Sequence, residues 1–109
     1  MLRLIAPLFA FAVVAAAPAP ALADDYVLVI KEHRFQPAEL TVPAGQRIKI
    51  TIDNRDPTPE EFESHDLRRE KIIPGHTKGT VWVGPLEPGA YGFYGEFHQD
   101  TAQGKLIAK

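Results

Sequence analysis

Short segments in which apolar and polar residues alternate, bounded by glycine and proline, run from residue 25 to the end of this chain. In residues 47–53, RIKITID, three isoleucines alternate with Lys49 and Thr51, which buries one face of a strand and leaves the other in water. Similar β-rich runs are DYVLVIKEH, ELTV, TVWV, AYGFYG and GKLIAK. About seven or eight short strands with such turns, and no segment of helical length and period, predict an all-β fold, a Greek-key antiparallel β-sandwich or small barrel.

Residues 1–23 have the composition of a secretory signal peptide. They combine a basic start at Arg3, an apolar middle and a small-residue site, ALA, at residues 21–23. A membrane anchor is the alternative, but prolines interrupt the apolar run, which falls short of the roughly 20 residues of a spanning helix. We therefore expect cleavage after Ala23, a single domain over residues 24–109, a periplasmic location, and membrane contact only through a partner.

The inventory of side chains excludes some functions. The chain has no cysteine, so an exported domain of this size has no disulfide to stabilise it and depends on packing or on a bound metal. Its formal net charge is −2 and it has no basic patch, so nucleic acid is not expected as a partner.

Imidazole and carboxylate groups are the remaining candidate metal donors. Mixed nitrogen and oxygen ligands suit Fe(II), Mn(II), Zn(II) or Cu(II). The four histidines are His33, His65, His76 and His98, and carboxylates crowd around two of them at Glu60, Glu61, Glu63, Glu96 and Asp100.

Two stretches resemble the cupredoxin family and cover nearly all of the chain after the signal peptide. FQPAELTVPAGQRIKITIDN resembles the F-x-P…V-x-x-G-x…I-x-N opening, and LEPGAYGFYGEFHQDTAQGKLIAK resembles the closing P-G-x-Y-x-F-x-C-x-x-H-x-x-x-M-x-G-x-L-x-V. In this register His98 matches a copper histidine, Gly95 stands at the copper cysteine and Ala102 at the axial methionine. The upstream copper histidine falls near Glu60, so one of the family's four ligands is kept.

The missing sulfur excludes a type 1 blue copper centre. Such a centre needs a thiolate with two histidines and a weak axial thioether. The chain has no cysteine, and its one methionine, Met1, leaves with the signal peptide. We therefore expect an iron or copper ion held by nitrogen and oxygen donors.

The segment EEFES, residues 60–64, is similar to the E-W-E or E-F-E motif of EfeO-type periplasmic proteins of ferrous-iron uptake. The chain as a whole resembles the small exported cupredoxins of bacterial iron-transport systems, the FtrB type. This resemblance implies a protein that accompanies an iron permease and handles or oxidises ferrous iron.

Strand geometry selects among the acidic residues. Alternate residues share a face, so Glu61 and Glu63 point the same way and Phe62 the other, with Glu60 on the face of Phe62 as the competing candidate. In a cupredoxin-like sandwich the first strand's end, the EEFES strand and the last loop meet at one pole. We therefore expect a metal site there formed by His33, Glu61, Glu63 and His98.

Other interpretations stay open. Each predicted ligand also fits a solvated strand or loop position, and the two outer glutamates would then protect a sheet edge from pairing. The chain is then a metal-free cupredoxin scaffold for protein interaction, or a copper chaperone with histidine and carboxylate ligands. The sequence does not decide between an enzyme that oxidises Fe(II) and an accessory protein that binds it.

Overall fold

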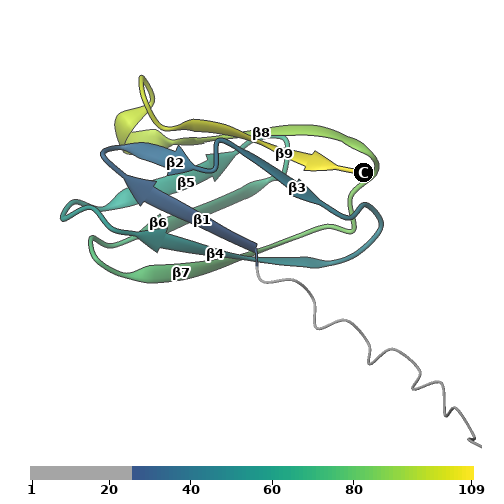
Figure 1. Cartoon of the computed structure of the whole chain (residues 1–109), viewed down its shortest axis with the longest axis horizontal. Helices are drawn as coiled ribbons and strands as arrows, with labels where there is room; N and C mark the ends of the chain where they lie inside the picture. The colour runs from purple at the N-terminus through teal and green to yellow at the C-terminus, as the bar shows by residue number, and fades with distance from the viewer. Residues whose placement is uncertain (1–25) are drawn as a thin grey trace, which may run out of the picture.

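The structure, a computed structural model, describes residues 26–109 as two β-sheets packed face to face (Figure 1). The predicted signal peptide and its cleavage site lie outside the described residues. The first sheet has the order β2 (Arg34–Gln36), β1 (Tyr26–Lys31), β4 (Ile48–Asn54) and β7 (Lys78–Val83). The second has the order β3 (Glu39–Val42), β9 (Gln103–Ala108), β8 (Gly89–Gly95), β5 (Glu60–Ser64) and β6 (Arg69–Ile73). A single 3₁₀ turn, η1 (Glu96–His98), follows β8.

The predicted all-β sandwich is confirmed, and its strand pairing is mixed. β1 pairs with β4 and β3 pairs with β9 in parallel, while the other pairs are antiparallel. Alternation in a sequence reports which face of a strand is buried, not which strand lies beside it. In β4 the alternation holds as predicted, because Ile48, Ile50 and Ile52 are buried in the core.

An aromatic cluster fills the core near one end of the sandwich. Phe35 of β2 meets Phe93 of β8 edge to face with ring centroids 5.0 Å apart, and Phe62 of β5 lies 5.2 Å from Phe93. Aromatic pairs of this kind contribute about 0.5–1.5 kcal/mol beyond the area they bury. The cluster therefore fixes, relative to one another, the three strands whose ends carry the candidate site.

No helix within residues 26–109 is long and apolar enough to cross a bilayer.

Candidate metal site

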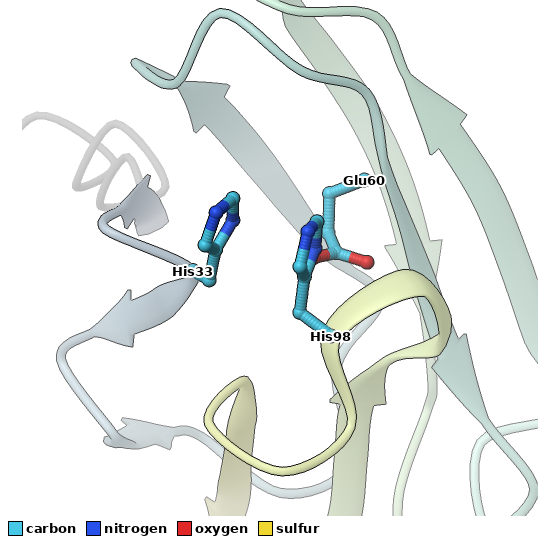
Figure 2. Close-up of side chains that lie close together, drawn as sticks. All are labelled: His33, Glu60 and His98. Atoms are coloured by element: carbon cyan, nitrogen blue, oxygen red, sulfur yellow. The ribbon is translucent and has the colours of Figure 1, made fainter.

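Three segments that are distant in the sequence meet at the end of the sandwich that carries η1. His33 lies in the turn between β1 and β2, Glu60 is the first residue of β5, and His98 is the last residue of η1. One donor atom from each of the three side chains lies within 4.8 Å of the others. Figure 2 shows the two imidazole rings side by side, with the carboxylate of Glu60 next to His98.

Glu60 is a buried carboxylate whose oxygens are both occupied. Its side chain is 1% exposed, and a buried charge is stable only when it is paired and hydrogen-bonded. Oε2 lies 2.6 Å from Nδ1 of His98, and Oε1 accepts the backbone N–H groups of Phe97 at 2.9 Å and Glu61 at 3.1 Å. The carboxylate is therefore held in place before any ligand arrives.

The two histidines form a stacked pair. Their ring centroids are 3.6 Å apart and their planes differ by 14°. Nδ1 of His33 is buried and has no hydrogen-bond partner; Oδ2 of Asp56 is 3.5 Å away. A buried polar atom without a partner costs about 1–3 kcal/mol, and a metal ion at this point would remove that cost. The donor set present at this end therefore fits a cation.

The site is open on one side. The side chain of His33 is 43% exposed and that of His98 is 27% exposed. Both rings line a surface hollow together with Phe97 and the carboxylates of Glu96 and Asp100. An ion bound by the ring nitrogens and the Glu60 carboxylate would keep coordination positions on this open side for water or another small ligand.

The four positions that the resemblance assigns to copper ligands lie together at this end. A Cβ atom on Gly95 would lie 2.5 Å from Cδ of Glu60 and 2.7 Å from Cβ of Ala102. The backbone of Ala102 accepts the N–H of Gly95 at 2.8 Å and donates to the carbonyl of His98 at 2.8 Å. The carboxylate of Glu60 therefore occupies the space that a cysteine side chain at position 95 would need.

The structure brings together two of the four predicted ligands, His33 and His98. The predicted alternation in β5 is confirmed, since Phe62 is buried while Glu61 and Glu63 lie on the other face. Those two glutamates form a separate acidic group with Glu70 of β6. The expectation that they join the histidines is therefore not met.

Glu60, the competing candidate, takes their place. Its position two residues before Phe62 is the sequence signal that identifies Glu60. Phe62 faces the core, and in a strand the residue two positions earlier lies on the same face, so Glu60 faces the core as well. The E-x-E resemblance directed the prediction to the outer pair instead.

Of the remaining histidines, His65 lies outside the site. Its Nε2 is 2.9 Å from the hydroxyl of Tyr94, on the outer face of the second sheet. His76 lies in the loop between β6 and β7, where its backbone N–H donates to the carbonyl of Asp56 at 2.9 Å.

Asp56, which sequence reasoning missed, lies next to His33, with its Oδ2 atom 3.5 Å from Nδ1 of the His33 ring. Burial acts to raise the pKa of its carboxyl, but hydrogen bonds from the backbone N–H groups of His33 and Glu32, and the nearby imidazoles, outweigh it. The pKa of Asp56 is therefore lowered from its usual 3.8. The carboxylate is ionised at neutral pH and strengthens both bonds.

This lowered pKa predicts an acid dependence of stability. Because the folded value lies below the unfolded one, Asp56 stabilises the fold fully above about pH 4 and loses that contribution as the pH falls through its folded pKa. Thermal melts of the metal-free protein between about pH 6 and 2.5 should show a steeper acid loss of Tm for the wild type than for Asp56→Asn. Parallel curves for the two proteins would contradict the assignment.

Comparison with known proteins agrees with the fold and with the family resemblance. The model of the cupredoxin-like domain family matches residues 4–108. An uncharacterized protein of Rickettsia prowazekii (strain Madrid E) is 50% identical over 80 residues, which cover 73% of this chain and 64% of that relative. This chain therefore spans 64% of the length of the relative it matches.

Solved structures of copper proteins share the architecture. Auracyanin A, a "blue" copper protein from Chloroflexus aurantiacus, matches with a TM-score of 0.67 and 18% identity over 78% of this chain and 98% of its own. Amicyanin from Paracoccus versutus matches with a TM-score of 0.63 and 20% identity, covering 85% of this chain and 87% of its own. The purple cupredoxin of Nitrosopumilus maritimus matches with a TM-score of 0.62 and 19% identity, covering 78% of this chain and 100% of its own. At these identities the likeness shows the fold alone.

Proposed function

We propose that this chain, which belongs to the cupredoxin-like domain family, is a periplasmic metal-binding protein that assists ferrous-iron uptake. It binds Fe(II) at the end of the sandwich through His33, Glu60 and His98. The fold itself suggests a metal-binding or electron-transfer-like role; the choice of iron rests on the donor set.

The observation that carries the proposal is the grouping of two imidazoles and one carboxylate beside an open hollow. Two histidines and one carboxylate with free coordination positions are the ligand set of non-haem Fe(II) sites. Cu(II) also accepts nitrogen and oxygen donors, so it is the competing ion. Cu(I) is disfavoured, because thiolate and thioether ligands are absent from the site.

Oxidation of the bound ion is a second step beyond binding. The Glu60 carboxylate favours Fe(III), which is a harder ion than Fe(II) and prefers oxygen donors. Each oxidation releases one electron, so the step needs an acceptor such as dioxygen or a partner that carries a second metal. The proposed core function is therefore binding and handover, with a ferroxidase activity dependent on that acceptor.

The proposed partner is an iron permease. The support is the resemblance of the EEFES and His98 segments to exported cupredoxins of iron-transport systems, together with the signal-like residues 1–23. If this is right, loss of the protein in its own host lowers the rate of ferrous-iron uptake, and a variant lacking both site histidines does not restore it.

Titration calorimetry under nitrogen tests the binding. Wild-type protein is expected to bind one Fe(II), and His33→Ala/His98→Ala is expected to bind none while keeping its strand signal. Outer-face Glu61→Gln/Glu63→Gln is the matched control and should bind as the wild type does. Absence of saturable Fe(II) binding to the wild type would overturn the proposal. Tight Cu(II) binding in that case would favour a copper chaperone. Binding of neither ion would favour the metal-free scaffold.

A further inference from the structure

The turn that carries His33 has a backbone conformation that its residues disfavour. β1 and β2 form a hairpin in which Lys31 pairs with Arg34, leaving Glu32 and His33 as a two-residue turn. Both have positive φ, 53° and 57°. Hairpin turns of this kind usually contain Asn-Gly or Gly-Gly, because other side chains clash in the left-handed region. Such strained residues gather at functional sites, where the surrounding structure holds them in place.

The carboxylate of Asp56 is the group that holds this turn. Oδ1 accepts the backbone N–H of Glu32 at 2.8 Å, and Oδ2 accepts that of His33 at 3.0 Å. The same Oδ2 lies 3.5 Å from Nδ1 of the His33 ring. Asp56 is 8% exposed, so both bonds are shielded from competing water.

Asp56 is itself fixed by a buried amide. Its backbone N–H donates to Oδ1 of Asn54 at 3.0 Å. Asn54 is 1% exposed, and its Nδ2 donates to the carbonyls of Thr58 at 2.9 Å and Ile73 at 3.0 Å. The loop after β4 is thus a rigid support for the carboxylate.

The backbone of His33 is also bonded on its other side. The hydroxyl of Thr101 donates to the carbonyl of His33 at 2.6 Å. Thr101 belongs to the loop that follows η1, and its own N–H donates to the carbonyl of His98 at 3.2 Å. The two histidine-bearing segments are therefore joined by hydrogen bonds through Thr101.

We propose that Asp56 is a positioning residue of the metal site, which holds the left-handed Glu32–His33 turn and thereby sets the His33 ring against His98. The inference rests on the proposed function for its effect on metal binding. Its effect on the ring pair exists without metal and is tested separately.

The first test uses NMR of the metal-free protein. In the wild type, stacking should shift the ring protons of His33 and His98 upfield of those of the two other histidines. Asp56→Asn is expected to abolish this difference. Asp66→Asn should preserve it, because Asp66 also accepts one backbone N–H, from Gly92 at 2.9 Å, but lies away from the site. An unchanged upfield shift in Asp56→Asn would overturn the proposal.

The second test is Fe(II) affinity under nitrogen. Loss of a group that orients a ligand costs about 10–100-fold in metal affinity, and this is the decrease expected for Asp56→Asn. Glu32→Gly/Asp56→Asn should recover most of both the affinity and the upfield shift, because glycine adopts positive φ without strain. Recovery of the shift without recovery of affinity would show that Asp56 is a direct ligand and would contradict a positioning role.

Failure of the proposed function remains distinguishable from failure of this inference. If the wild type binds no metal, the proposed function is wrong. The ring-proton shifts of the metal-free protein still test whether Asp56 positions the His33 ring. If Asp56→Asn does not fold, the double variant supplies the test: it is expected to fold with nearly the wild-type shift and affinity, and loss of the shift in it would contradict the inference. Unfolding of both variants would contradict a role confined to the turn.

Discussion

Glu60→Gln is expected to lower the affinity for Fe(II) by more than about 100-fold, which exceeds the usual cost of losing a residue that only orients a ligand. The change replaces an anionic oxygen donor with a neutral amide, and the side chain at this position is only 1% exposed to solvent. Size and shape are kept, and the amide oxygen can still accept the N–H groups of Phe97 and Glu61. The fold should therefore survive, and the loss should appear in binding.

Calorimetry under nitrogen measures this effect, and Glu63→Gln is its control. Glu63 lies in the same strand on the opposite face, where burial and the neighbouring charges of Glu70 and Glu61 raise its pKa. Removing that charge should relieve repulsion within the acidic group and leave Fe(II) binding at the histidine end unchanged. A large loss of Fe(II) affinity in the Glu63 variant, with no loss in the Glu60 variant, would show that the metal site lies on the outer face instead.

Gly95→Ala is expected to destabilise the protein by about 1–3 kcal/mol, the usual cost of forcing an extra carbon into a packed interior. Gly95 has extended φ and ψ of −90° and 113°, so the position does not need the backbone freedom of glycine. The obstacle is steric, because a Cβ would lie 2.5 Å from Cδ of Glu60 and 2.7 Å from Cβ of Ala102. The carboxylate must move, so metal affinity should fall with stability.

Thermal denaturation measures the cost, at roughly 4–8 °C in Tm per kcal/mol for a domain of this size. Gly92→Ala, in the same strand, is the matched control, since its Cβ would have only an ordinary contact, 3.6 Å from Asp66. Glu60→Ala should reduce the cost of the alanine at 95, with a coupling energy of about 0.5–3 kcal/mol. Equal costs in both backgrounds would show that Glu60 does not fill the space beside Gly95.

The sequence was sufficient for the all-β architecture and for His33 and His98, two of the three side chains that meet at the candidate site. Alternation in β4 and β5 correctly predicts which residues face the core, because burying apolar side chains dominates the choice of face. His98 was found because it matches a copper histidine in the cupredoxin resemblance, and His33 from its place at the end of the first strand. Parallel pairing of β1 with β4 and of β3 with β9 was not predictable, because no local pattern specifies a strand's neighbour.

The carboxylates of the site were harder to assign because they break the usual rule of burial. Charged residues are almost never buried unless they are paired. The shared face of Glu61 and Glu63 and the E-x-E resemblance pointed to that half-buried pair instead. Glu60 is buried because His98 and two backbone N–H groups satisfy its carboxylate. Asp56 depends on a turn distant in the sequence, which becomes visible only when Glu32 and His33 are seen with positive φ.

Anomalous diffraction at the iron edge, from crystals loaded with Fe(II) under nitrogen, would locate the bound ion. One strong peak is expected within bonding distance of His33, Glu60 and His98. A peak at the outer acidic group of Glu61, Glu63 and Glu70, or no peak in crystals that contain excess Fe(II), would contradict it.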